Sequence, residues 1–289
     1  MAFDKLMGLT NRFLSSAQAL AAMSAHLRLA ELGVAGDAAV RVQLDRVLDE
    51  LGVREELDDL DAGERSVLLS FARSYLGQAI DLIEDPARAS GWSHSDAVLL
   101  QAQGSASAVV ATLISEAGLG SPGARILDVG VGVAGLATAF CKVFPDATVV
   151  GIDPWAPSLA IARVNVGSAG LDSRVTLVDT TIEDFEDAVG FDLVWLPSFF
   201  IPESVLDVAV TRVFELVQAG GTVVVGVRFA DETDPVMAAA DDLFTVRSGG
   251  SVLDPGEAIL RLERAGFADV HEVARTWNPP LRFIVGRRA

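Results

Sequence analysis

The chain has 289 residues, of which 51% are hydrophobic, so it can build a sizeable core and is too apolar for a disordered segment. Its formal net charge of −18 repels phosphate backbones and anionic lipid surfaces, which disfavours nucleic acids and membranes as partners. Cys141 is the single cysteine, so an intramolecular disulfide is excluded, as in a reducing cytoplasm. Neither a secretory pattern nor an apolar run of about 18 residues is evident, so no membrane span is predicted.

The first part of the chain has the pattern of helices. Apolar residues recur at three- and four-residue spacing in 11–32 and 64–83, which predicts helices with one apolar face. Asp61 and Glu64 form a capping-box pattern at the start of the second helix. A further helix is expected from Asp96 to about residue 116, and no strand is predicted before it.

The pattern changes after the loop 118–123, which we take as the boundary between an all-helical domain (1–120) and a second domain (121–289). Short β-branched runs then alternate with helical stretches, which is typical of a parallel sheet buried on both faces. The last two runs are joined by a short turn, so they are expected to be antiparallel. The fold class is therefore α/β, with a doubly wound, mostly parallel seven-stranded sheet. The expected strands are 125–129, 148–152, 175–178, 193–196, 222–227, 268–274 and 281–286.

A glycine-rich turn directly follows the first of these strands. Asp128, Gly130, Gly132 and Gly135 form the pattern D-x-G-x-G-x-x-G, and a helix is expected to follow over 136–144. Glycines permit a tight turn and let a ligand approach the backbone closely. Because glycine turns link many strands to helices, the pattern alone is weak evidence for a nucleotide site.

Acidic residues at the next two strand ends strengthen this interpretation. The second strand ends at Asp153, where a carboxylate can accept hydrogen bonds from both ribose hydroxyls of an adenosine. The third ends at Asp179, on the same edge of the sheet. An NAD site uses similar signals, but the charge of Asp128 would repel a pyrophosphate and hold a cationic amino-acid group.

With these motifs in order, residues 124–289 resemble the catalytic domain of class I S-adenosylmethionine-dependent methyltransferases. The matching segments are ILDVGVGVAG, GIDPW, VTLVDTTIEDF, FDLVWLPSFF, AGGTVVVGV and LERAGFADVHEV.

The resemblance implies S-adenosyl-L-methionine as cofactor. The glycines of the turn would contact its methionine part, Asp153 its ribose and Asp179 its adenine, while Leu196 and Pro197 would lie near the reactive methyl group. The full set of implied cofactor-binding residues is Asp128, Gly130, Gly132, Gly135, Asp153, Pro154, Trp155, Asp179, Thr180, Leu196 and Pro197.

A helical segment before such a domain is similar to small-molecule O-methyltransferases of plant and bacterial natural-product pathways. In that group the fourth motif runs into a His-Asp-Trp-Pro sequence whose His is the general base, whereas Phe199 stands at that place here. The N-terminal part also lacks an obvious winged-helix pattern. Both departures put His-catalysed phenol methylation in doubt. The resemblance makes the N-terminal helices candidates for a lid and for the interface of a homodimer.

His94 is the candidate catalytic base, because it lies beside Trp92 in a loop before the second domain and imidazole titrates near neutral pH. An ordinary surface histidine is the alternative. Trp92, Phe199 and Phe200 are candidates for an apolar acceptor pocket, and Arg228 for binding an acceptor carboxylate. The alternatives are core packing for the aromatic residues and a surface ion pair for the arginine. Phe229, Met237 and Trp277 are further candidates for lining that pocket.

The sequence thus predicts a cytoplasmic methyltransferase of secondary metabolism that acts on a small apolar or aromatic metabolite, at oxygen, carbon or nitrogen. The expected partner is this small-molecule acceptor, with no nucleic acid, membrane or metal. Two alternatives stay open: an NAD-dependent oxidoreductase, and a non-catalytic protein of methyltransferase-like fold that binds the cofactor.

Overall fold

The computed structural model describes residues 2–228 and 234–289, and the chain divides into two compact units, Met1–Glu84 and Asp85–Ala289. The division lies before the helices expected around 96–116, whereas the sequence suggested a boundary in the loop 118–123. These helices pack on the first helix of the sheet, so they belong to the second unit.

The first unit is a small helical assembly built around four leucines. Leu27, Leu48, Leu57 and Leu69 are each at most 4% exposed and come in turn from the successive helices. The predicted capping box is confirmed, since the backbone N–H groups of Asp61 and Glu64 donate to each other's carboxylates, each at 2.9 Å. The helices are α1 (Ala2–Leu32), α2 (Ala38–Leu51), α3 (Arg54–Asp59) and α4 (Ala62–Glu84).

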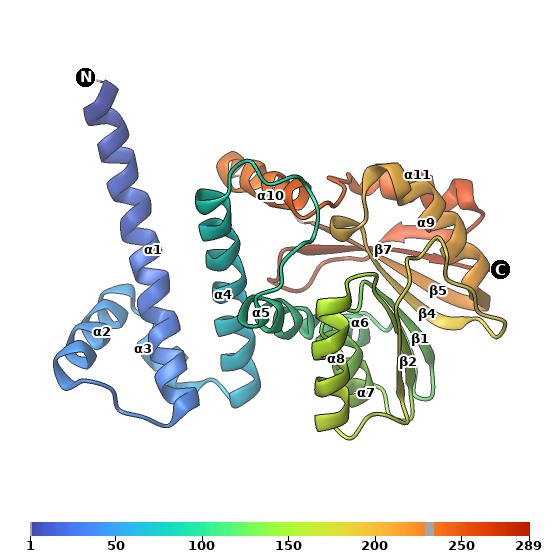
Figure 1. Cartoon of the computed structure of the whole chain (residues 1–289), viewed down its shortest axis with the longest axis horizontal. Helices are drawn as coiled ribbons and strands as arrows, with labels where there is room; N and C mark the ends of the chain where they lie inside the picture. The colour runs from blue at the N-terminus through green and yellow to red at the C-terminus, as the bar shows by residue number, and fades with distance from the viewer. Residues whose placement is uncertain (1, 229–233) are drawn as a thin grey trace. The chain divides into compact units, whose positions relative to one another are not determined.

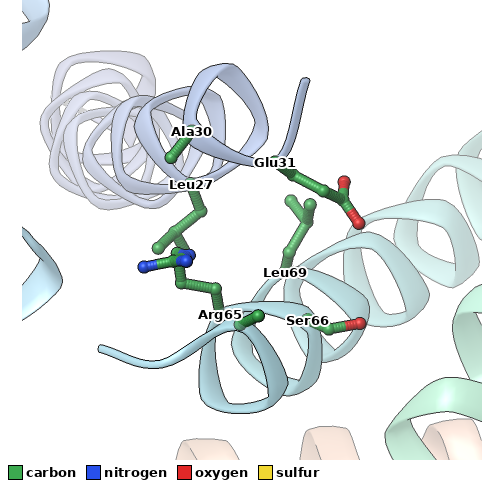
Figure 2. A pocket seen from close by; sticks show the side chains of 7 residues that line it. Leu27, Ala30, Glu31, Arg65, Ser66 and Leu69 are labelled. Carbon is green, nitrogen blue, oxygen red and sulfur yellow. The ribbon is translucent and has the colours of Figure 1, made fainter. Parts of the chain in front are cut away.

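A pocket of about 170 Å³ lies between α1 and α4 in this unit (Figure 2). Leu27 and Leu69 form its apolar part, and the side chains of Glu31 and Arg65 stand at its rim. Both charged groups already have partners, because Glu31 pairs with Arg28 and the Arg65 guanidinium donates to a backbone carbonyl.

The second unit contains a seven-stranded sheet in the order β3-β2-β1-β4-β5-β7-β6, which confirms the expected doubly wound, mostly parallel fold (Figure 1). Strands β1 to β5 run parallel, and β7 is antiparallel to both β5 and β6. The strands are β1 (Arg125–Val129), β2 (Thr148–Ile152), β3 (Val175–Val178), β4 (Phe191–Pro197), β5 (Val217–Arg228), β6 (Ala268–Glu272) and β7 (Leu281–Arg287).

Two apolar layers sandwich this sheet, because successive residues of a strand point to opposite faces. Ile126 and Leu193 pack with the helices of one face, while their neighbours Leu127 and Val194 pack with those of the other. One face is covered by α6 (Val109–Glu116), α7 (Gly135–Val143) and α8 (Ala156–Ser168), and the other by α9 (Glu203–Leu216) and α11 (Pro255–Ala265).

One segment of the described residues, Ala97–Glu116, is long and apolar enough to cross a membrane by length and composition, with a mean hydropathy of 1.5. In the fold it breaks at Ala108 into α5 (Ala97–Ser107) and α6, and both helices pack against α7. Leu100, Ala111 and Ile114 of this segment are buried. Its apolar side chains thus serve the core of the sheet unit.

Candidate functional site

The glycine-rich turn follows β1 and is hydrogen-bonded to the end of β2. Gly130 and Gly132 have positive φ angles of 72° and 57°, which other residues rarely adopt. The N–H groups of Gly130 and Val131 both donate to the carbonyl of Ile152 at 2.9 Å. The turn is therefore held tightly at the carboxyl edge of the sheet, where ligands of such folds bind.

Gly135 has a packing role that the sequence did not reveal. A Cβ atom at Gly135 would lie 2.0 Å from the carbonyl oxygen of Gly104 in α5, and one at Gly104 would lie 2.1 Å from a methyl group of Val133. Both glycines are needed because α5 and the start of α7 touch backbone to backbone. The predicted contact of Gly135 with the cofactor stays a prediction.

Asp153 is the centre of the hydrogen bonding at this edge. Its carboxylate accepts the backbone N–H of Gly132 at 2.8 Å and that of Trp155 at 2.7 Å, and the side chain is almost buried. Burial raises the pKa of Asp153, these two N–H groups lower it, and the neighbouring charge of Asp179 raises it. Two acidic strand ends therefore lie close enough to act on each other.

Asp128 adds a third carboxyl group from the end of β1. Burial and the charge of Asp153 raise the pKa of Asp128 to about 8, against a lowering by the backbone N–H of Ala137. Its Oδ2 atom is buried and has no hydrogen-bond partner among the described residues. Such a site would gain from a positively charged ligand and would disfavour a pyrophosphate.

The end of β4 lies directly beside the glycine turn. Asp128 pairs with Trp195 in the sheet, which places the following Leu196 and Pro197 next to the end of β1. The ring of Pro197 lies 4.0 Å from the position that a Cβ of Gly130 would take. Both β4 residues are buried, and their place near the reactive methyl group stays a prediction.

The remaining cofactor candidates lie in the loops after β2 and β3. Pro154 is exposed directly after Asp153, and Trp155, which begins α8, is half-buried. Asp179 is exposed after the last residue of β3, and Thr180 is half-buried next to it. All four follow the carboxyl ends of two neighbouring parallel strands.

The acceptor candidates form one aromatic cluster. The ring of Trp92 meets Phe200 edge-on at 5.3 Å between centroids, and Phe200 meets Phe199 at 5.1 Å. The guanidinium of Arg228 lies 5.1 Å from the centre of the Phe199 ring. His94 joins the cluster through Trp92, with the two rings 4.8 Å apart. Residues far apart in the chain are thus brought together, and their role in binding an acceptor stays a prediction.

Sequence reasoning missed the groups that hold the loop carrying Trp92 and His94. Arg247 lies at the end of α10 (Pro235–Arg247). Its guanidinium donates to the carbonyl of Asp85 at 2.6 Å, and its backbone carbonyl accepts the N–H of Gly91 at 3.0 Å. A Cβ at Gly250 would lie 1.9 Å from the carbonyl oxygen of Phe199. The paired glycines 249 and 250 were the available signal, because adjacent glycines permit close backbone approach.

The other pocket candidates lie elsewhere. Trp277 is buried against Phe283, with ring centroids 4.8 Å apart, and Met237 is 54% exposed on α10. Phe229 lies outside the described residues. In residues 2–228 and 234–289, no group of three or more His, Cys, Asp or Glu residues is placed to hold a metal ion.

Comparisons with known proteins bear on this site. Residues 126–221 match a family model described as a methyltransferase domain. A segment of 71 residues is 37% identical to the ribosomal RNA small subunit methyltransferase H of Bifidobacterium adolescentis, covering 25% of this chain. The match spans about a fifth (21%) of the length of that relative.

Solved structures share the fold over almost the whole chain. An O-methyltransferase assigned in Nostoc punctiforme has 17% identity and a TM-score of 0.69, covering 97% of this chain and 98% of that one. The pyocyanin biosynthetic protein PhzM has 22% identity and a TM-score of 0.69, with 100% and 99% covered. Human N-acetylserotonin methyltransferase, in complex with SAM, has 14% identity and a TM-score of 0.65, with 98% of each chain covered.

The raised pKa of Asp128 makes a prediction about stability. Between pH 3.8 and about 8 the folded protein holds a proton that the unfolded chain has released, so the free energy of unfolding falls as the pH rises through this range. Asp128→Asn cannot ionise there. We expect its melting temperature, relative to the wild type without cofactor, to increase from pH 5 to pH 8 when followed by circular dichroism.

The exposed Glu263→Gln serves as the control and should show no such pH-dependent difference. A melting-temperature difference between Asp128→Asn and the wild type that stays constant over this pH range would contradict the burial of an ionisable Asp128.

Proposed function

Residues 126–221 are a class I methyltransferase domain with S-adenosyl-L-methionine as cofactor, and from this premise we propose that the protein methylates a small aromatic or apolar metabolite. The observation that carries the proposal is the aromatic cluster of Trp92, Phe199 and Phe200. The two phenylalanines lie in the short helical turn that directly follows β4. Methyl transfer needs the acceptor in line with the methyl group and its leaving sulfur, and a planar apolar wall favours that alignment for a planar acceptor.

We assign the cofactor to the three acidic strand ends and the glycine turn. Asp153 would accept the ribose hydroxyls, Asp128 would face the cationic amino-acid part, and Asp179 with Thr180, Pro154 and Trp155 would surround the adenine. Gly130, Gly132, Leu196 and Pro197 would complete the site. The unpartnered buried oxygen of Asp128 fits this ligand, because an ammonium group would stabilise the ionised form of the carboxyl group. The bound cofactor supplies an activated methyl group.

We propose that Arg228 selects acceptors that carry an acidic group near the ring. Its guanidinium packs over Phe199, and its charge lowers the pKa of the buried Asp241, which burial otherwise raises. A guanidinium at an aromatic wall matches a planar molecule with a carboxylate or phenolate. Oxygen is the favoured acceptor atom, and carbon or nitrogen are the alternatives.

We propose His94 as the base for acceptors that carry a proton at working pH. The position that supplies a histidine in similar O-methyltransferases is Phe199 here, which cannot take up a proton. The imidazole of His94 is placed by the Trp92 ring, which itself touches Phe200. The base thus comes from the loop before α5, in place of the end of β4.

A small-molecule acceptor in secondary metabolism is favoured over a nucleic acid. PhzM is named as a pyocyanin biosynthetic protein, and another structure of this fold is named as a mitomycin 7-O-methyltransferase. The match to a ribosomal RNA methyltransferase covers a short segment, and a chain of net charge −18 repels RNA. A cytoplasmic location is proposed from the lone cysteine, which fits a reducing compartment.

We propose that two copies of the chain associate through the first half of α1. Phe3, Leu6, Phe13 and Leu14 recur at helical spacing and are 52–72% exposed, whereas the buried residues of α1 lie in its second half. This half of the helix carries one acid and two bases, Asp4, Lys5 and Arg12. Two copies can therefore pair there without bringing acidic surfaces together. The helical segment also remains the candidate for a lid.

Cofactor binding is tested by titration calorimetry with S-adenosylhomocysteine and with NADH. We expect binding of the first and none of the second. Asp153→Ala should weaken S-adenosylhomocysteine more than about tenfold, since two charge-assisted hydrogen bonds of about 1.5–3 kcal/mol each are lost. Asp153→Asn, which keeps the shape of the side chain and one acceptor oxygen, separates loss of charge from disruption of the turn. Unchanged affinity in both variants would refute the ribose assignment.

The base is tested with a panel of phenols, aromatic carboxylic acids and carbon acids, using cofactor with a labelled methyl group. For an accepted phenol, His94→Gln should lower turnover by about 10²–10⁴-fold, the usual contribution of a positioned base. His271→Gln, on the exposed strand β6, is the control. Intact turnover in His94→Gln would exclude His94 as the base. Cofactor binding without methylation of any panel member would favour the non-catalytic alternative.

Association is tested by analytical ultracentrifugation. The wild type should sediment as a dimer, and Phe13→Glu should shift it to a monomer with unchanged helicity, because a charge is placed on the apolar stripe. Val189→Glu, at a 72% exposed valine of the sheet unit, is the control and should remain dimeric. A monomeric wild type, or a dimer that persists in Phe13→Glu, would refute this interface.

A further inference from the structure

The loop that carries Trp92 and His94 is held at both ends. We call residues 85–96 the strap; it leads into α5 beside the sheet (Figure 1). At its start, the guanidinium of Arg247 donates to the carbonyl of Asp85, and midway along the strap the N–H of Gly91 donates to the backbone carbonyl of Arg247. At its end, the carboxylate of Asp96 caps α5 by accepting the N–H of Leu99 at 2.8 Å. The strap is therefore fixed at its ends by groups that do not belong to the proposed cofactor site.

Between these ends, a tryptophan of the cofactor edge binds the strap. The indole Nε1–H of Trp155 donates to the carbonyl oxygen of His94 at 2.7 Å, from a residue 61 positions away in the chain. Trp155 is half-buried at the start of α8. This bond fixes the backbone of the one strap residue that we propose as a base.

The same Trp155 is bonded to the proposed ribose acceptor. Its backbone N–H donates to Oδ1 of Asp153 at 2.7 Å, while Oδ2 accepts the N–H of Gly132. One residue thus touches the carboxylate at the end of β2 with its backbone and the strap with its side chain. A ligand that binds Asp153 restrains the carboxylate to which Trp155 donates.

From His94 the contacts continue to the acceptor wall. The rings of His94 and Trp92 meet edge to face at 4.8 Å, and Trp92 meets Phe200 at 5.3 Å. A movement of the strap backbone at His94 would displace both rings relative to Phe200. The orientation of the acceptor pocket therefore depends on the position of the indole.

We infer that Trp155 is a positioning residue that couples the two halves of the site: it holds His94 and Trp92 against the acceptor wall, and holds them more firmly when the cofactor occupies Asp153. The inference rests on the proposed function for the identity of the ligand. Its physical basis is a continuous series of contacts from Gly132 through Asp153, Trp155 and His94 to Phe200, in which ordering one member reduces the freedom of the next.

The test uses the three histidines of the full-length chain. Labelling the imidazole Cε1 with ¹³C gives three signals, and His94→Gln identifies that of His94. In the wild type we expect this signal to be displaced by the ring current of Trp92, and to shift and sharpen when S-adenosylhomocysteine is added. In Trp155→Phe, which keeps an aromatic ring without the N–H, most of the displacement and of the cofactor response should be lost.

Trp277→Phe is the matched control, because the indole of Trp277 also donates to a backbone carbonyl, that of Leu281, at 2.9 Å. It should leave the His94 signal unchanged. Amide exchange over 92–95 should become roughly threefold to tenfold faster in Trp155→Phe, as expected for the loss of one hydrogen bond, and should stay unchanged in the control. Because Trp155 is also assigned to the adenine site, the wild type and both variants are compared at saturating S-adenosylhomocysteine.

A His94 signal in Trp155→Phe that matches the wild type with and without ligand would overturn the inference. A wild-type His94 signal whose position and width do not change when S-adenosylhomocysteine binds would also overturn it. If Trp155→Phe does not fold, the test is the hydrogen-exchange rate of the Trp155 indole N–H in ¹⁵N-labelled wild type, with and without S-adenosylhomocysteine. Slowing by the ligand supports the inference, and unchanged exchange refutes it. Failure of S-adenosylhomocysteine to bind the wild type would instead refute the proposed function.

Discussion

Three carboxyl groups crowded at neighbouring strand ends are the constraint on which the rest of the site depends. Asp128 lies near the end of β1, and Asp153 and Asp179 directly follow the neighbouring strands β2 and β3. The charge of Asp179 raises the pKa of Asp153, and the charge of Asp153 raises that of Asp128. Backbone N–H groups stabilise Asp153 only in part, and one oxygen of Asp128 is buried without a partner in the described residues. Such a cluster would be stabilised by a bound cation, which supports the proposed sulfonium nucleoside at this edge.

Helix α5 packs against the glycine turn and begins where the strap ends. Through Gly104, α5 lies against Gly135 backbone to backbone, and at its first turn Asp96 caps it. The strap therefore leads into the helix that packs against the end of the glycine turn. The indole of Trp155 adds a second connection between them at His94. Cofactor and acceptor sides of such a site are joined by packing and by a hydrogen bond, which makes their coupling a property of the fold.

The segment after β4 carries a phenylalanine where the resemblance to small-molecule O-methyltransferases implies a histidine. Phe199 is 8% exposed and carries no titratable group. Its backbone is pressed against Gly250, and its ring lies beside the guanidinium of Arg228, so it is a packing residue and the proposed acceptor wall. In the proposed reaction, proton transfer for an acceptor that requires it would fall to a group from another segment. His94 is the imidazole that the contacts of the aromatic cluster bring there.

The sequence by itself determined the presence of the seven strands, their mostly parallel direction and the acids at the ends of the first three. The bounds of β1, β2 and β3 are those predicted, because buried β-branched runs between glycines and acids are local signals. The acids then meet because carboxyl ends of parallel strands share one edge. Only the tertiary structure decided the division at residue 84, the packing role of Gly135 and the anchoring of the strap. The bonds that hold the strap join residues 61 and 162 positions apart, and local periodicity contains no information about contacts at such separations.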